Sequence, residues 1–242
     1  MKILITNDDG IDALGIRLLA EWAKKLGEVT VVAPKVEQSA KSHAIEIIKR
    51  FEIKKVPLID GVTAYSVDST PADCVRFGIM GLKEKFDLVL SGINRGVNVG
   101  ADIVYSGTCA AAFEAARLST PAIAFSAFHD DQQQAVKHLD TACDYIVKNK
   151  LLDENLIYNV NIPYQVKGVK ITCQGSFYFS DEFVKVDGEE NLYFQDGVPV
   201  PDEYPNDLSR DTVAIVNDYI SITPLMATRT NMAVFEKYKD KV

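Results

Sequence analysis

The 242-residue chain has few of the residues that build zinc sites or disulfide frameworks. It contains three histidines and four cysteines, and the cysteines, at positions 74, 109, 143 and 173, form no CxxC pair. Scattered cysteines without histidine partners at zinc spacing predict reduced, buried thiols, as expected of a cytoplasmic protein.

The chain also lacks an excess of basic residues and any long apolar run. Its 26 Lys and Arg residues are outnumbered by 34 Asp and Glu residues, which gives a formal net charge of −8. This balance argues against a protein that binds the backbone of a nucleic acid polymer. Without a signal-peptide pattern or a membrane-spanning segment, we expect a cytoplasmic protein with no membrane partner.

An acidic pair follows the first apolar segment of the chain. Residues 3–5 are Ile-Leu-Ile, and Asp8, Asp9 and Gly10 come shortly after them. The apolar segment is typical of a buried parallel strand, and ligands bind at the carboxyl ends of such strands. Because adjacent carboxylates repel each other, a divalent metal would stabilise the ionised pair. The alternative is an ordinary polar turn in which an aspartate caps the next helix.

Strand and helix patterns alternate through the first 150 residues, which predicts a doubly wound, mainly parallel α/β sheet. We expect core strands over residues 29–33, 64–67, 86–90 and 121–126, helices over residues 14–26, 70–81, 109–116 and 132–148, and an exposed antiparallel ribbon over residues 44–56.

The pattern changes after residue 150, so we divide the chain into a core, residues 1–150, and a carboxyl-terminal extension, residues 151–242. Several aromatic residues of the extension are too apolar to leave in water, which predicts that the extension assembles subunits. We expect strands over residues 156–162 and 219–223, one arm of a hairpin over residues 169–179, an acidic loop over residues 181–211, and a terminal helix or arm over residues 226–237.

Polar loops follow three of the predicted core strands. They carry the Asp8–Asp9 pair, Ser39 and Asn94, and together offer an all-oxygen set that suits Mg²⁺ or Mn²⁺ better than zinc. A fourth segment, residues 105–108, leads into the helix expected over residues 109–116. Free amides and hydroxyl groups at this helix start predict an anion site.

Three motifs resemble the signature of the SurE family, the metal-dependent 5′/3′-nucleotidases. They are ILITNDDG at residues 3–10, SGINRGVN at residues 91–98 and YSGT at residues 105–108. Supporting matches cover nearly the whole chain: TPADCV at residues 70–75, NVNIP at 159–163, DTVA at 211–214 and YISITPL at 219–225.

The resemblance implies a Rossmann-like core and a homodimer or homotetramer joined by exchanged carboxyl-terminal arms. It implies one divalent cation per subunit and nucleoside monophosphate substrates, with short polyphosphates as a further possibility in the family. One departure concerns Ala40, which stands where many members have glycine after the serine. The implied metal ligands are Asp8, Asp9, Ser39 and Asn94, and the implied phosphate contacts are Asn94, Ser106, Gly107 and Thr108.

Two further residues have a functional and an ordinary interpretation. His43 could protonate the leaving group or be a surface histidine, and Arg95 could bind a phosphate or be a solvated loop charge. For the attacking water, Asp8 is the preferred activating residue, although adjacency alone does not separate it from Asp9.

Three rival functions fit parts of the pattern. A phosphoacceptor signalling domain also places an acidic pair after its first strand, but Ser91 and Ser126 stand where it would need other residues. A phosphatase with an aspartate nucleophile would need a DxD spacing, whereas Asp8 and Asp9 are adjacent. A nucleotide-binding module without catalysis is the third alternative.

Overall fold

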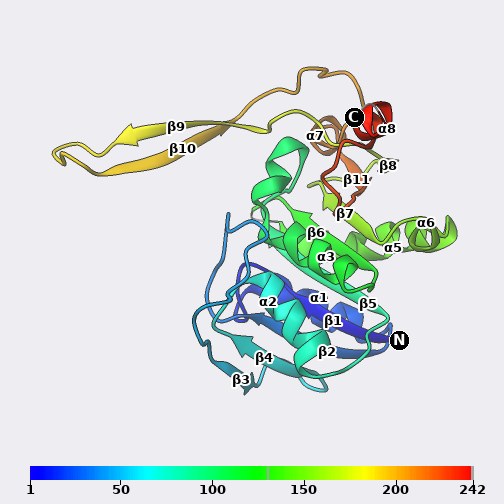
Figure 1. The fold of residues 1–242 in the computed structure, drawn as a ribbon. Helices are drawn as coiled ribbons and strands as arrows, with labels where there is room; N and C mark the ends of the chain where they lie inside the picture. The colour runs from blue at the N-terminus through cyan, green and yellow to red at the C-terminus, as the bar shows by residue number, and fades with distance from the viewer. Residues whose placement is uncertain (130, 241–242) are drawn as a thin grey trace.

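The computed structural model describes residues 1–129 and 131–240, and its centre is a mixed, mainly parallel sheet (Figure 1). Within this part of the chain the sheet has nine strands in the order β3-β4-β2-β1-β5-β6-β7-β11-β8. Pairing is antiparallel only for β3 with β4 and for β7 with β11. The strands are β1 (Lys2–Thr6), β2 (Glu28–Pro34), β3 (Ile53–Val56), β4 (Thr63–Val67), β5 (Leu88–Arg95), β6 (Ala122–Ala127), β7 (Ile157–Ile162), β8 (Gly168–Ile171) and β11 (Tyr219–Pro224).

Helices cover both faces of the sheet. Successive residues of β1 point to opposite faces, so they pack against helices on opposite sides. Ile3 and Ile5 pack in one core with α1 (Leu14–Ala23) and α5 (Leu139–Lys148). Leu4 packs in the other core with α2 (Pro71–Arg76) and α3 (Gly107–Arg117). The shorter helices are η1 (Phe77–Gly81), η2 (Gly100–Tyr105), α4 (Gln132–Ala135), η3 (Val136–His138), α6 (Leu151–Glu154), α7 (Asp211–Val216) and α8 (Met232–Tyr238).

The strand order places the acidic pair at a topological switch point. From β1 the chain continues to β2 and β4 on one side, and it later returns to β5 on the other side of β1. In open α/β sheets ligands bind beside the carboxyl ends of strands at such a point. The loops that follow β1, β2 and β5 therefore meet at one edge of the sheet.

The carboxyl-terminal strands differ from the prediction. Residues 169–179 do not form a hairpin arm, because β8 pairs in parallel with the distant β11. The hairpin consists of β9 (Phe179–Lys185) and β10 (Tyr193–Pro199), inside the segment expected to be a loop, and it extends away from the sheet (Figure 1). Both of its faces are exposed, so its sequence lacks the apolar alternation of a half-buried strand. The strands β7, β11 and β8 continue the main sheet, and the division near residue 150 stays a prediction.

Several smaller predictions are confirmed or corrected. The mainly parallel, doubly wound sheet and the strand at residues 53–56 of the expected ribbon are present, but residues 44–50 form no strand. The helix expected over residues 132–148 is divided into α4, η3 and α5. Cys74 and Cys109 are buried, whereas Cys173 is exposed, against the expectation of buried thiols. No helix within the described residues is long and apolar enough to cross a membrane.

Candidate active site

Asp8 lies just beyond β1 and packs directly against the start of α3. Its carboxyl group is almost fully buried, with 4% of the residue exposed, and the hydroxyl of Thr108 donates to Oδ1 over 2.5 Å. Gly107 permits this approach, because a Cβ atom at position 107 would lie 2.8 Å from the Cβ of Asp8. The absence of a side chain at Gly107 thus brings the carboxylate and the helix amino terminus together.

Burial raises the pKa of Asp8 to about 6. Hydrogen bonds from the Thr108 hydroxyl and from the backbone amides of Asp8 and Thr108 favour the ionised form, and the charge of Asp9 opposes it. The hydrogen bonds to Asp8 therefore lower its pKa by less than the loss of surrounding water raises it.

Asp9 faces a different cavity from Asp8. Its Oδ2 accepts a hydrogen bond from the backbone amide of Arg95 over 3.0 Å. The cavity on this side has a volume of about 690 Å³ and is also lined by Glu37 and His129. Burial raises the pKa of Asp9, although the amide and the charge of Arg95 act against this shift. The two adjacent carboxylates are thus separated by the orientation of their side chains.

The cavity beside Asp8 collects most of the other residues expected in the site. It has a volume of about 650 Å³, and Asp8, Ser39, Asn94 and Ser106 all line it. The remaining lining residues are Ala40, Arg95, Val97, Asn98, Val99, Asp102, Tyr105, Tyr178, Phe179, Asp181, Gln195, Asp196 and Gly197.

Ser39 and Asn94 contribute neutral oxygen atoms to this cavity. The Ser39 hydroxyl donates to the carboxylate of Glu37 over 2.7 Å, so its oxygen keeps lone pairs for a ligand. The Asn94 amide nitrogen donates to the Gly96 carbonyl over 2.7 Å, which leaves Oδ1 as its ligating atom. With the buried carboxylate of Asp8, these oxygens form a donor set that fits a hard divalent cation.

The amino terminus of α3 completes the cavity. Ser106 is the residue before the helix, and its hydroxyl oxygen accepts from the amide of Cys109 over 3.0 Å. Its hydroxyl proton can therefore be donated to a bound anion. The first amides of an eleven-residue helix also carry partial positive charge. A buried carboxylate, two neutral oxygen donors and a helix amino terminus thus share one cavity.

Comparison with known proteins agrees with this arrangement. The family model described as survival protein SurE matches residues 3–181. The chain belongs to the SurE family. It is 42% identical over 233 residues to a 5′-nucleotidase SurE of Thermoanaerobacter sp. (strain X514), covering 93% of this chain and 92% of that protein. It is 41% identical over 254 residues to a 5′-nucleotidase SurE of Thermosipho africanus, covering 100% and 99% of the two chains.

A solved structure extends the similarity to the fold. The crystal structure of the SurE protein from Aquifex aeolicus superposes with a TM-score of 0.80 at 35% identity. The match covers 99% of this chain and 98% of that chain. The carboxyl-terminal extension is therefore included in the similarity to the SurE family, although the family model ends at residue 181.

The side chains of three residues expected in the site contact other residues of this SurE-family chain. The Thr108 side chain is fully buried, and its hydroxyl donates to Asp8. His43 hydrogen-bonds to Glu114 over 2.9 Å and lines a separate cavity of about 600 Å³. The Arg95 guanidinium lies 3.8 Å from Glu37 and borders both the Asp8 and the Asp9 cavities. The structure thus brings Arg95, but not His43, to the Asp8 cavity.

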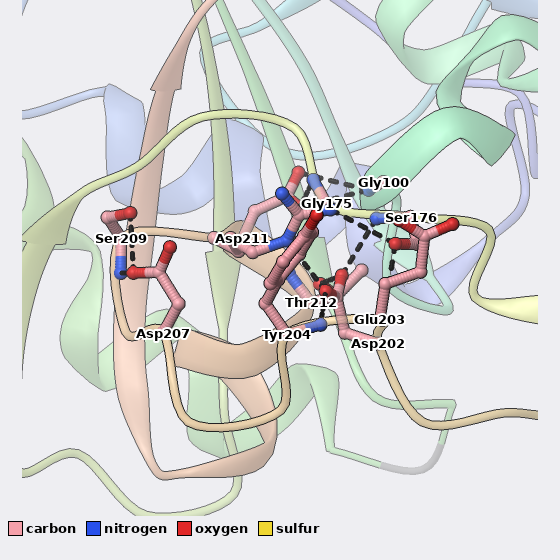
Figure 2. A network of polar contacts seen from close by, with 11 residues as sticks. Gly100, Gly175, Ser176, Asp202, Glu203, Tyr204, Asp207, Ser209, Asp211 and Thr212 are labelled. Atoms are coloured by element: carbon pink, nitrogen blue, oxygen red, sulfur yellow. Dashed lines mark hydrogen bonds and ion pairs between the residues drawn. The ribbon is translucent and has the colours of Figure 1, made fainter.

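Sequence reasoning missed a network of hydrogen bonds around Asp202 and Asp211 (Figure 2). The buried carboxylate of Asp211 accepts hydrogen bonds from the amides of Gly100, Gly175 and Thr212 at distances of 2.7–3.1 Å. Burial raises the pKa of Asp211 even though these three amides act against the shift. The motif at residues 211–214 marked this aspartate, but nothing in the local sequence indicates its partners Gly175 and Gly100, which lie 36 and 111 residues away.

Asp202 forms the second half of this network. Its carboxylate accepts from the amides of Ser176 and Tyr204 and from the Thr212 hydroxyl, and it forms an ion pair with Arg210 at 2.6 Å. Burial opposes ionisation of Asp202, but these donors hold its pKa well below the ordinary value. The network fastens the segment before β9 to the segment that leads into η2 and Ser106.

Proposed function

We propose that this chain is a metal-dependent 5′-nucleotidase that hydrolyses nucleoside monophosphates to nucleoside and phosphate. Membership in the SurE family supports this function, and the named relatives are 5′-nucleotidases. The observation that carries the proposal within this chain is the contact between the buried Asp8 and the amino terminus of α3. A cation held by Asp8 would lie beside an anion held by the helix.

One divalent cation, Mg²⁺ or Mn²⁺, is held by Asp8, Asp9, Ser39 and Asn94 in this proposal. Asp8, Ser39 and Asn94 share one cavity, and Asp9 is included because of its place in the family motif. When bound, such a cation acidifies a water molecule and neutralises charge on the phosphate oxygens. Hard oxygen donors without a thiolate or imidazole favour these cations over zinc.

Several side chains have separate roles in the proposed hydrolysis. Thr108 fixes one oxygen of Asp8, so Oδ2 is the atom that orients the attacking water. Ser106 and the amide of Gly107 hold the phosphate oxygens as negative charge develops, whereas the hydroxyl and the amide of Thr108 bind Asp8. Arg95 supplies a further cationic contact at the cavity edge. Protonation of the leaving group by His43 would require its ring to leave Glu114.

Phosphate release tests the function directly. Purified chain is incubated with AMP or GMP in the presence of Mn²⁺, Mg²⁺ or a chelator, and free phosphate is measured. The expected result is metal-dependent release, abolished by the chelator. A phosphoacceptor domain would become phosphorylated without continuous release, and a binding module would bind the nucleotide and release nothing. Short polyphosphate in the same assay tests the second substrate class.

Assembly into a homodimer or homotetramer is part of the same proposal. The exposed side chains of α8 and of the β9–β10 hairpin include large apolar residues, namely Phe183, Tyr193, Phe194, Met232, Val234 and Phe235. Leu225 is buried and pairs with Ile157, so the terminal arm begins after it. Removal of residues 226–242 is therefore expected to reduce the number of subunits per particle, which light scattering measures as the mass of the assembly. An unchanged mass would exclude the arm as the assembly element.

A further inference from the structure

Ser39 lies in a segment without regular secondary structure. We call this segment, residues 35–46 between β2 and β3, the Ser39 loop, and it contains turns but no helix or strand. Ala40 and Ser42 have φ angles of 55°, in the left-handed region that is unfavourable for a residue with a side chain. Contacts with the rest of the chain must therefore hold this conformation, and with it the place of Ser39 in the cavity of Asp8.

The part of the loop around Ser39 is attached to the end of β1 and to η2. The amide of Gln38 donates to the carbonyl of Asp8 over 2.7 Å. The amide and the hydroxyl of Ser42 donate to two carbonyls of η2 over 3.0 and 2.7 Å. A hydrogen bond to a charged group is stronger than these neutral ones, and the loop has such a contact at His43.

His43 joins the Ser39 loop to a buried carboxylate on α3. Its Nε2 donates to Oε2 of Glu114 over 2.9 Å, and the Glu114 side chain is only 3% exposed. Arg76, from α2, donates to the other carboxylate oxygen, also over 2.9 Å. Burial opposes ionisation of Glu114, but the hydrogen bonds and charges of His43 and Arg76 lower its pKa below the ordinary value. The ionised carboxylate thus links the loop to two helices.

The Ser39 loop is fastened again after His43, at the start of α2. The amide of Glu46 donates to Oδ2 of Asp73 over 2.8 Å, and the hydroxyl of Thr70 donates to a loop carbonyl over 2.7 Å. Because this end of the loop is fixed, the place of His43 constrains the path of the residues that precede it. Those residues include Ser39.

His43 and Ser39 belong to different cavities. The ring of His43 stacks on Phe113, with centroids 6.3 Å apart, and both residues line the cavity of about 600 Å³. Ser39 lines the cavity of Asp8. We propose that His43 and Glu114 are positioning residues that hold Ser39 in the proposed metal site. This inference rests on the proposed function, and it assigns protonation of the leaving group to a group other than His43.

His43→Ala tests the inference, with His43→Gln as the conservative variant. His43→Ala removes the contact of the loop with Glu114 and leaves the ion pair between Glu114 and Arg76 in place. The dissociation constant of Mn²⁺, measured by calorimetry without substrate, is expected to rise about tenfold, as for other residues that orient a metal ligand. Glutamine keeps an N–H donor for Glu114 but cannot act as an acid. His43→Gln is therefore expected to restore both the Mn²⁺ affinity and kcat.

Trypsin cleavage after Lys41 measures the order of the loop without metal or substrate. Lys41 is exposed and lies within the Ser39 loop. Its cleavage is expected to be about tenfold faster in His43→Ala than in wild type, because proteolysis follows the population of the open loop. Mass spectrometry of the released fragment identifies the cleaved bond. His43→Gln is expected to return the cleavage rate toward that of wild type.

Arg117→Gln is the matched control in the same cluster. Arg117 contacts Glu114 over 3.5 Å but belongs to α3 itself, so its replacement leaves the loop contacts in place. Mn²⁺ affinity and cleavage after Lys41 are expected to stay at wild-type values. Glu114→Gln is expected to reproduce the changes of His43→Ala. If this buried substitution prevents folding, His43→Ala decides alone, because it keeps the carboxylate paired.

Several outcomes would overturn the inference. Either an unchanged Mn²⁺ dissociation constant or unchanged cleavage after Lys41 in His43→Ala would do so. A His43→Gln variant that binds Mn²⁺ like wild type but loses kcat would identify His43 as the acid instead. Equal changes in Arg117→Gln would indicate a general loosening of α3. A wild-type chain that releases no phosphate would reject the proposed function alone, because protease cleavage and Mn²⁺ binding still measure the role of His43.

Discussion

Asp8 and Asp202 are both buried aspartates, yet their pKa values shift in opposite directions. Burial raises the pKa of Asp8 to about 6. Burial acts in the same sense on Asp202, but hydrogen bonds from Thr212, Tyr204 and Ser176 and the ion pair with Arg210 lower its pKa well below the ordinary value. Both residues have small exposed fractions, 4% and 8%, but Asp8 lies deeper among protein atoms and has no cationic partner, whereas Asp202 is paired with Arg210.

The comparison separates a carboxylate with a counter-charge inside the fold from the proposed metal ligand. Asp202 has a guanidinium of its own chain as counter-charge, so its ionised form is stable within the fold. The partners of Asp8 are a hydroxyl and amides, and its charged neighbour is another aspartate. A carboxylate held in this way gains most from a cation that comes from solution. Four experiments test the distinction.

Replacement of Asp8, the proposed metal ligand, has the largest expected effect. Asp8→Asn removes charge from the proposed metal site, and phosphate release from AMP at limiting Mn²⁺ is expected to fall at least about a hundredfold. The same loss is expected for Asp9→Asn. Asp12→Asn, which changes an exposed aspartate in the same loop, serves as the control. Near-normal turnover in both site variants would reject the assignment.

Replacement of the structural carboxylate is expected to affect stability. Asp202→Asn leaves Arg210 without its counter-charge and weakens three hydrogen bonds, so the free energy of unfolding is expected to fall by about 2 kcal/mol. Urea denaturation measures the change. The control is Asp207→Asn, since Asp207 is an exposed aspartate on the same segment that contacts Ser209. If both variants unfold at the same urea concentration, the network contributes nothing beyond a surface contact.

The hydrogen bond from Thr108 offers a smaller test of the Asp8 site. Thr108→Val removes the donor to Asp8 and keeps the shape of the side chain. The Mn²⁺ concentration for half-maximal activity is expected to rise about tenfold, as for other residues that orient a metal ligand. Thr120→Val, at a buried threonine just beyond the same helix, is the control. An unchanged metal requirement would show that Thr108 does not orient Asp8.

The smallest effect concerns acid unfolding. Because the folded-state pKa of Asp202 is lowered, its ionised form stabilises the fold fully above the unfolded-state pKa of about 4. This contribution is lost as the pH falls from there toward the folded-state pKa. The difference in unfolding free energy between wild type and Asp202→Asn is therefore expected to stay constant from pH 5 to 7 and to shrink below pH 4. A difference that grows on acidification would contradict the assigned shift.

Short-range patterns were sufficient to predict much of the central sheet and that the candidate site residues lie close together. Apolar segments followed by polar loops predicted β1, β2 and the first part of β5, because a buried parallel strand needs a continuous run of apolar residues. The strand β5 continues to Arg95, so Asn94 lies in the strand and not in the expected loop. The same reasoning placed Asp8, Ser39 and Asn94 at one edge, where the structure shows them around one cavity. It failed for the hairpin, whose two exposed faces impose no apolar alternation.

The sequence by itself determined the doubly wound core, the acidic pair at the end of its first strand and the resemblance to the SurE family. These features depend on residues that are neighbours along the chain. Only the tertiary structure decided the partners of the site residues, because they come from distant segments. Thr108 donates to a carboxylate 100 residues away, and Asp211 binds an amide 111 residues away. Residues of the β9–β10 hairpin line the same cavity as Asp8, and this arrangement likewise depends on contacts between distant segments that no local pattern encodes.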